Sequence, residues 1–124
     1  MTRKLIQFIN LNHTIKTIID DSTVTLSPLF QFRLLGVMKK IEPHLANFEV
    51  VRNDKIREYG EEKEDGSLSI PAENKEAMEK FNEAMSQVLD GKVTIGIEPF
   101  TVEEVFEEGI KAEYLMGLYD IMEK

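Results

Sequence analysis

The chain has 124 residues, of which 42% are hydrophobic and 31% charged, proportions that fit a globular domain and exclude a chain too polar to collapse. Its formal net charge of −8 is uneven, because residues 1–60 carry nine basic against six acidic side chains and residues 61–124 carry six against seventeen. The acidic second half would repel phosphate backbones, so we expect no direct binding to nucleic acid. At this length one core is expected, and we predict a single domain over residues 1–124.

Residue types that the sequence lacks exclude further classes of protein. Without cysteine the chain forms no disulfide and has no thiolate nucleophile, which favours a reducing, intracellular compartment. The first ten residues lack the features of a secretion signal, and no apolar run approaches the roughly 18 residues that a membrane span needs. We therefore expect no association with a membrane.

Residues 1–26 support two interpretations. Ile15, Ile18 and Ile19 are β-branched, which favours a strand, whereas Asn12 is a suitable cap for a helix that would run through Asp20. We predict a short strand followed by a helix in this region.

A long helix is predicted from Ser27-Pro28, since a hydroxyl cap followed by proline marks a helix start. Pro43 cannot donate a backbone hydrogen bond, so we expect a kink near residues 39–43 or two abutting helices. Gly60 is a suitable terminator, which places the long kinked helix at about 28–59. Its apolar residues recur every three or four positions, and five of them should share one buried stripe: Leu34, Met38, Ile41, Leu45 and Phe48.

The next segment alternates between turns and short elements. Residues 61–66 are acidic and close on Asp-Gly, so we expect a turn that faces solvent. The alternation around Leu68 predicts a short strand over residues 68–70, and helical spacing then runs from Ala72 or Asn74 to Leu89. Residues 92–97 alternate as a second strand, which we expect to pair with the first.

The C-terminal segment predicts two helices. Thr101 and Glu104 match a capping box, so a short helix should follow and reach about Glu108 before Gly109 breaks it. A final helix should close the core with one apolar face, formed by Tyr114, Leu115, Leu118, Ile121 and Met122. The predicted fold class is mainly α, α+β, with the long helix packed with two or three shorter helices and a small two- or three-stranded sheet.

No motif in the sequence predicts catalysis or a bound metal. His13 and His44 do not have the spacing of a metal site, and neither a nucleophile elbow nor a phosphate-binding loop is present. The 61–66 turn aligns poorly with a calcium loop, because Lys63 takes a ligand position and Ala72 replaces the closing glutamate. We expect a protein that is not an enzyme and has no cofactor and no metal.

Two acidic clusters are the candidate partner-binding residues. An acidic surface can anchor a basic partner, but carboxylates also gather on the outside of a helix whose first turn favours negative charge, and both interpretations stay open. Methionines at 78, 85, 116 and 122 have a similar ambiguity between an adaptable core and a binding groove. The candidate residues are Glu103, Glu104, Glu107 and Glu108 in one cluster and Glu61, Glu62, Glu64 and Asp65 in the other.

Five features follow one another along residues 27–124: the Phe-Glu-Val-Val-Arg-Asn-Asp-Lys-Ile-Arg-Glu-Tyr-Gly helix end (48–60), the acidic Asp-Gly turn, Ser-Ile-Pro (69–71), the helix with Glu-Lys-Phe (79–81) and the Val-x-Ile-x-Ile strand. In this order they resemble the small acidic uncharacterised proteins of tailed bacteriophages. The resemblance brings no catalytic residues with it.

This resemblance implies a phage-encoded accessory protein, structural or host-directed. Together with the absence of catalytic motifs and with a long helix able to present an extended face, it predicts a non-enzymatic protein-interaction module, a small virion or assembly component. It would act in the host cytoplasm or within the virion. Its partners would be a protein with a basic surface or other phage structural proteins, and a homo-oligomer stays open. The alternative is an acidic, host-directed inhibitor that occupies a basic or nucleic-acid-binding surface of a host protein.

Overall fold

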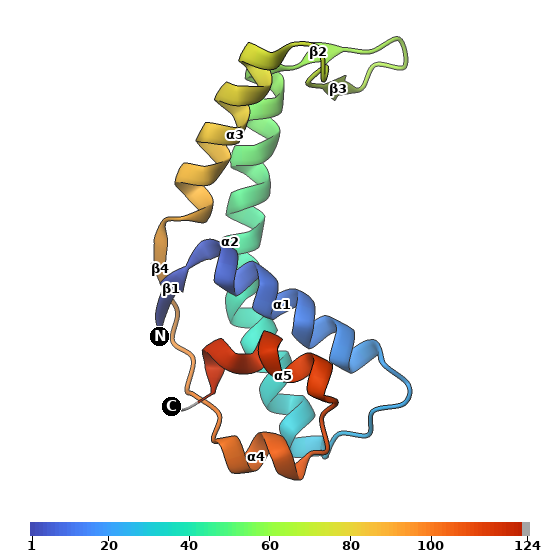
Figure 1. Ribbon diagram of the computed structural model, residues 1–124, viewed down its shortest axis with the longest axis vertical. Coiled ribbons are helices and arrows are strands. Elements are labelled where there is room, and N and C mark those ends of the chain that lie inside the picture. Colours follow the sequence, from blue (N-terminus) through green and yellow to red (C-terminus); the bar gives the residue numbers. More distant parts are fainter. Residues whose placement is uncertain (123–124) are drawn as a thin grey trace.

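The computed structural model describes residues 1–122 as five α-helices with a one-turn 3-10 helix and two small sheets. A single long helix runs through most of the length of the molecule, and the other elements pack along it (Figure 1). The described chain is mainly helical, as the sequence predicts, with four shorter helices where two or three were expected. The elements are α1 (Leu5–Asp20), α2 (Pro28–Tyr59), α3 (Lys75–Leu89), α4 (Val102–Glu107), α5 (Ala112–Leu118) and the 3-10 helix η1 (Tyr119–Ile121).

Two separate antiparallel sheets of two strands replace the single small sheet that was predicted. β1 (Thr2–Lys4) pairs with β4 (Lys92–Thr94), with Arg3 opposite Val93. β2 (Glu61–Glu62) pairs with β3 (Leu68–Ser69) as a local hairpin. The predicted pairing of residues 68–70 with 92–97 is therefore wrong.

The helix α3 explains why those two segments do not pair. It has 15 residues, so at about 1.5 Å per residue it carries the chain roughly 22 Å from β3 to β4. β4 then lies beside the N-terminus of the chain, where the Met1 amino group donates to the Ile95 carbonyl. The strand before α3 instead closes on β2 through the Asp-Gly turn, since Gly66 has a φ of 84° that favours glycine.

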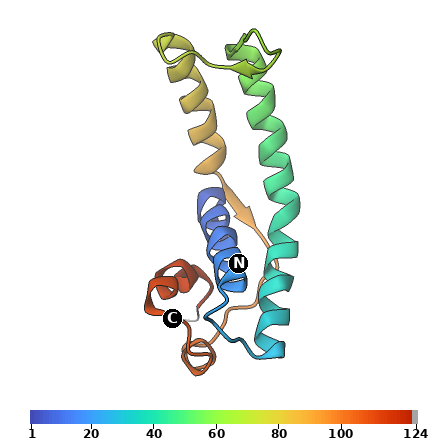
Figure 2. The same cartoon turned by 90° about the vertical axis from the view of Figure 1, so that its right-hand side faces the viewer.

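The N-terminal region is a short strand followed by a helix, as predicted, but α1 begins at Leu5 rather than near Asn12. Phe8, Leu11 and Ile15 are buried at spacings of three and four, so helical burial outweighs the β-branched character of the segment. α1 packs against both α2 and α5, and it lies between them in the lower part of the molecule (Figure 2).

The long helix α2 begins as predicted, with the Ser27 hydroxyl accepting a hydrogen bond from the Phe30 amide at 3.3 Å. It continues through Pro43 as one helix, so the alternative of two abutting helices is wrong. Pro43 and Lys39 are both exposed, and the Lys39 carbonyl that loses its backbone donor can therefore be hydrated.

The core lies in the part of the molecule that we call the base, residues 1–45 and 91–122. Leu34 and Ile41 are fully buried there, and Met38 and Leu45 pack against the core while partly buried. Phe48 is only half-buried and lies outside the core cluster, so its predicted place in the buried stripe is wrong. The core cluster consists of Phe8, Leu11, Ile15, Ile18, Phe30, Leu34, Val37, Ile41, Ile95, Ile97, Phe100, Val105, Ile110, Leu118 and Ile121.

Residues 46–90 form a projecting arm, in which α3 packs against the upper half of α2 and the β2–β3 hairpin forms the tip (Figures 1 and 2). Two helices alone cannot enclose their shared apolar face. Met85, at 7% exposure, is accordingly the only buried hydrophobic residue that the structure describes within the arm. Phe48 is only half-buried for the same reason, because it lies in the arm and not in the base.

The C-terminal helices begin and end close to the predicted residues. Thr101 and Glu104 form the capping box of α4, and Gly109, with a φ of 67°, follows the helix. Leu118 and Ile121 are fully buried, which confirms the predicted apolar face of the last helical segment. α5 therefore closes the base on the side of α1 that faces away from α2, and α4 lies across the lower end of the base (Figure 2).

Candidate interaction surfaces

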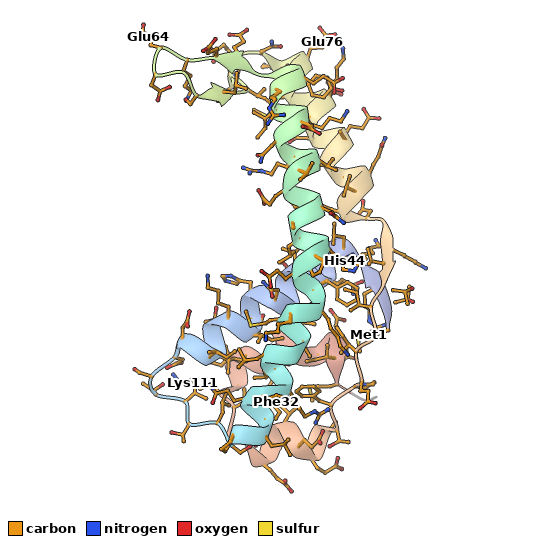
Figure 3. The ribbon with its side chains drawn as sticks, turned by 180° about the vertical axis from the view of Figure 1, so that it is seen from behind. Met1, Phe32, His44, Glu64, Glu76 and Lys111 are labelled. Carbon is orange, nitrogen blue, oxygen red and sulfur yellow. The ribbon has the colours of Figure 1, made fainter. Side chains whose placement is uncertain are left out.

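The two predicted acidic clusters lie at opposite ends of the molecule. Glu64 is at the tip of the arm (Figure 3), whereas α4 lies at the far end of the base (Figure 1). The long helix α2 separates them, and its 32 residues correspond to about 48 Å. The clusters therefore do not form one continuous acidic face for a single contact.

The acidic tip of the arm is exposed at Glu61, Glu62, Glu64 and Asp65. Asp65 accepts hydrogen bonds from the Ser67 hydroxyl at 2.6 Å and from the Ser67 amide at 3.0 Å. These bonds, the hydroxyl contact first, hold the pKa of Asp65 below its usual value. Asp65 thus stabilises its own turn, and the three glutamates face solvent.

In the α4 cluster, Glu104 is bound within the fold. Its carboxylate accepts the Thr101 amide at 2.9 Å and the Arg33 guanidinium at 2.8 Å. The Thr101 bond, followed by Arg33, lowers the pKa of Glu104. Arg33 also lies 4.0 Å from the centre of the Phe100 ring, so Glu104 joins α4 to α2 through a stacked cation.

Glu108 has a second structural contact. It accepts from the Ser27 amide at 2.8 Å and from the Ser27 hydroxyl, so its carboxylate lies at the N-terminus of α2. A negative charge is favourable there because the first amides of a helix carry partial positive charge. Of the four predicted residues in this cluster, Glu103 and Glu107 are exposed and Glu104 and Glu108 hold α4 against α2.

A further exposed surface, which lies outside the predicted acidic residues, is apolar. Met116 is 87% exposed and Phe106 is 61% exposed, and Tyr119 is exposed beside them. Together with Leu115 and Met122 these side chains line an open hollow of about 370 Å³. We call this set of five residues the α4–α5 hollow. Large apolar side chains gathered around one hollow usually mark a contact surface, whereas single exposed ones do not.

One sequence signal pointed to this hollow. In α5 the buried face is marked by Leu118, and Met116 is two positions earlier, about 200° around the helix. A methionine on the face opposite the buried stripe has no place in the core. The sequence alone leaves Met116 between core and groove, and the exposure of its side chain excludes the core.

The rim of the α4–α5 hollow is acidic. Glu103 lies one helical turn from Phe106, and Glu113 lies one turn before Met116. Both are exposed. Residues 101–122 carry six carboxylates against one lysine, and that lysine, Lys111, is ion-paired with Asp21 at 2.9 Å.

Asp21 fixes the position of α5. It accepts hydrogen bonds from the Thr23 hydroxyl at 2.6 Å, the Tyr114 hydroxyl at 2.6 Å and the Lys111 ammonium at 2.9 Å. These bonds, Thr23 first, hold the pKa of Asp21 well below its usual value. The same contact raises the pKa of Tyr114 to about 12. The contacts of Asp21 with Lys111 and Tyr114 could not be predicted from the sequence, because these residues are 90 and 93 positions away.

A second exposed apolar stripe lies on the first turns of α2. Leu29, Phe32 and Leu35 are spaced by three residues, and Phe32 is 74% exposed (Figure 3). The pocket that Leu29 borders is also lined by Arg33 and Glu104, so it does not have an apolar lining like that of the α4–α5 hollow. The stripe provides matched exposed positions against which the α4–α5 hollow can be tested.

Other kinds of site have less support in residues 1–122. No three histidine, aspartate or glutamate side chains in this range lie close enough together to hold a metal ion. None of the helices described in it is both long and apolar enough to cross a membrane. In comparisons with known proteins, no protein-family model, no curated protein and no solved structure matches the chain.

Proposed function

We propose that this protein is a non-enzymatic protein-interaction module that binds a protein partner through the α4–α5 hollow. The observation that carries the proposal is the exposure of Met116 and Phe106 around one hollow, at 87% and 61%. Burying these side chains against a partner would remove apolar surface from water, which is the main favourable contribution to most protein association.

The resemblance to proteins of tailed bacteriophages supports a more particular assignment, a small virion or assembly component that acts in the host cytoplasm or within the virion. The arm adds to this support. It holds the acidic tip far from the α4–α5 hollow, so two partners could be bound at once without touching each other. Such spacing suits a component that acts by contact within a larger complex.

The alternative is an acidic inhibitor that occupies a basic surface of a host protein. It is favoured by the seventeen acidic side chains of residues 61–124 and by the exposure of Glu103 and Glu107. Against it, the two clusters lie at opposite ends of the molecule, and Glu104 and Glu108 are already bound within the fold. A purely electrostatic contact therefore has less support than an apolar one.

The proposal is tested by co-purification from cells that produce the protein, with three forms of the chain as bait. A partner bound through the α4–α5 hollow should be retained by the unchanged chain and lost with Met116→Ser. Phe32→Ser is the matched control, since it removes an equally exposed apolar side chain elsewhere, and it should retain the partner. Retention that is indifferent to Met116→Ser would contradict the proposed site.

A further inference from the structure

We infer that the α4–α5 hollow takes a basic amphipathic helix of a partner protein. Apolar side chains of that helix would lie on Phe106, Met116 and Tyr119, and its lysines or arginines would face the acidic rim. The inference rests on the proposed function and names the chemistry of the partner. It follows from three properties of the surface: its lining, its backbone and its charge.

The lining suits apolar side chains of varied shape. A hollow of about 370 Å³ is large enough for several side chains, and two of its five lining residues, Met116 and Met122, are methionines. A methionine side chain is unbranched and flexible, so it adapts to aliphatic or aromatic groups. Grooves that bind amphipathic helices use this property to receive side chains spaced three and four residues apart.

The backbone of the hollow favours a helix over an extended strand as the occupant. Side chains of α4, of α5 and of the segment that follows α5 line the hollow, and none of the strands β1–β4 contributes a lining residue. An extended segment gains its affinity by pairing with an open sheet edge. A partner helix satisfies its own backbone and needs only side-chain contacts, which this surface provides.

The charge of the rim decides which helix would bind. Of the six carboxylates within residues 101–122, Glu104 is paired with Arg33 and Glu108 is bound to Ser27, which leaves four others, and the one lysine of this segment is paired with Asp21. A second copy of this surface would bring like charges together, and an anionic lipid surface would be repelled in the same way. A helix with lysine or arginine beside its apolar stripe meets the opposite charge at Glu103 and Glu113.

The inference is tested by titrating the protein with three synthetic peptides of about 18 residues, long enough to form a helix of about 27 Å. The first has leucine and lysine at amphipathic spacing, the second has leucine and glutamate at the same spacing, and the third contains the first peptide's residues in shuffled order. Binding is followed by methyl NMR of the methionines and by fluorescence anisotropy, at about 0.15 M salt to limit long-range attraction.

The first peptide should shift the methyl signals of Met116 and Met122 and leave those of Met78 and Met85, which lie in the arm, unchanged. The other two peptides should bind at least about tenfold more weakly. Phe106→Ser should weaken binding of the first peptide by about tenfold, and Phe32→Ser should change it by less than about twofold. Glu103→Gln with Glu113→Gln should slow its association and reduce the dependence on salt.

Three results would overturn the inference. Equal binding of the shuffled peptide would mean that charge alone attracts it, and equal binding of the glutamate peptide would mean that the rim does not select. Methyl shifts confined to the arm would place the contact elsewhere. If co-purification still depends on Met116 while the first peptide fails, the proposed function stands and the basic-helix inference is wrong. If dependence on Met116 is absent from both experiments, both are wrong.

Discussion

Gly117 lies where α5 meets α1, and replacing it with alanine tests the packing that positions the α4–α5 hollow. An added Cβ would lie 2.2 Å from the Thr14 Oγ1 atom, 2.5 Å from its Cγ2 and 2.8 Å from its Cβ. All three distances are far inside van der Waals contact, so α5 would have to move away from α1. Overpacking of this kind costs about 1–3 kcal/mol.

Intrinsic helix propensity predicts the opposite sign for this change, because glycine to alanine in a helix interior stabilises by about 1 kcal/mol. Gly36 in α2 provides the matched control. An added Cβ there meets nothing within 4 Å, so Gly36→Ala should raise the free energy of unfolding. The two variants make the same chemical change and differ in what the new methyl group meets.

Urea unfolding measures both effects. Gly117→Ala should lower the unfolding free energy by about 1–3 kcal/mol, and adding Thr14→Ala should recover part of the loss, since it removes the two closest atoms and leaves only the Cβ atom at 2.8 Å. Gly36→Ala should raise it by up to about 1 kcal/mol. The close packing of α1 and α5 would be refuted if Gly117→Ala were as stable as the unchanged chain, or if Thr14→Ala gave no recovery.

Three further predictions concern stability and pH. The pKa of Asp21 is held below its usual value of about 3.9, so the contribution of this carboxylate to stability is complete above that pH and is lost as the pH falls below it. Asp21→Asn should therefore lower the midpoint of thermal unfolding at neutral pH, and the midpoint of this variant should fall less in acid. Because the pKa of Tyr114 is raised to about 12, stability should decline as the pH rises from about 10 to 12, and Tyr114→Phe should remove that part of the decline in urea titrations. Phe48→Ala should lower the free energy of unfolding by about 1–2 kcal/mol, because Phe48 is half-buried, whereas Leu34→Ala should lower it by about 2–5 kcal/mol at a fully buried site. Equal losses of the two variants in chemical unfolding would contradict the division into base and arm.

Local signals in the sequence predicted most of the helix boundaries. The Ser27 cap, the Asn74 start and the Thr101–Glu104 capping box each satisfy backbone groups within a few residues, so their effect does not depend on the rest of the fold. The period of buried residues in α2 was equally readable in the base. The prediction from this period was wrong at Phe48, because periodicity identifies the apolar face of a helix and does not tell what covers that face.

Features that join distant parts of the chain could not be predicted in this way. The partner of β4 is β1, which is about 90 residues away in sequence, and nothing in either strand specifies the other. In the same way, Glu104 and Glu108 looked like a surface cluster because Arg33 and Ser27 reach them only in the folded chain. The site that we propose therefore lies on the apolar side chains beside these carboxylates.

The central claim, that the α4–α5 hollow is the contact surface, is tested most directly by photo-crosslinking from within it. A benzophenone side chain would replace Phe106 in one form of the protein and Phe32 in another, both of them exposed positions. In cells that produce the protein, we predict a crosslinked adduct with a partner from position 106 and little or none from position 32. Equal adducts from both positions, an adduct from position 32 alone, or no adduct from either would contradict the claim.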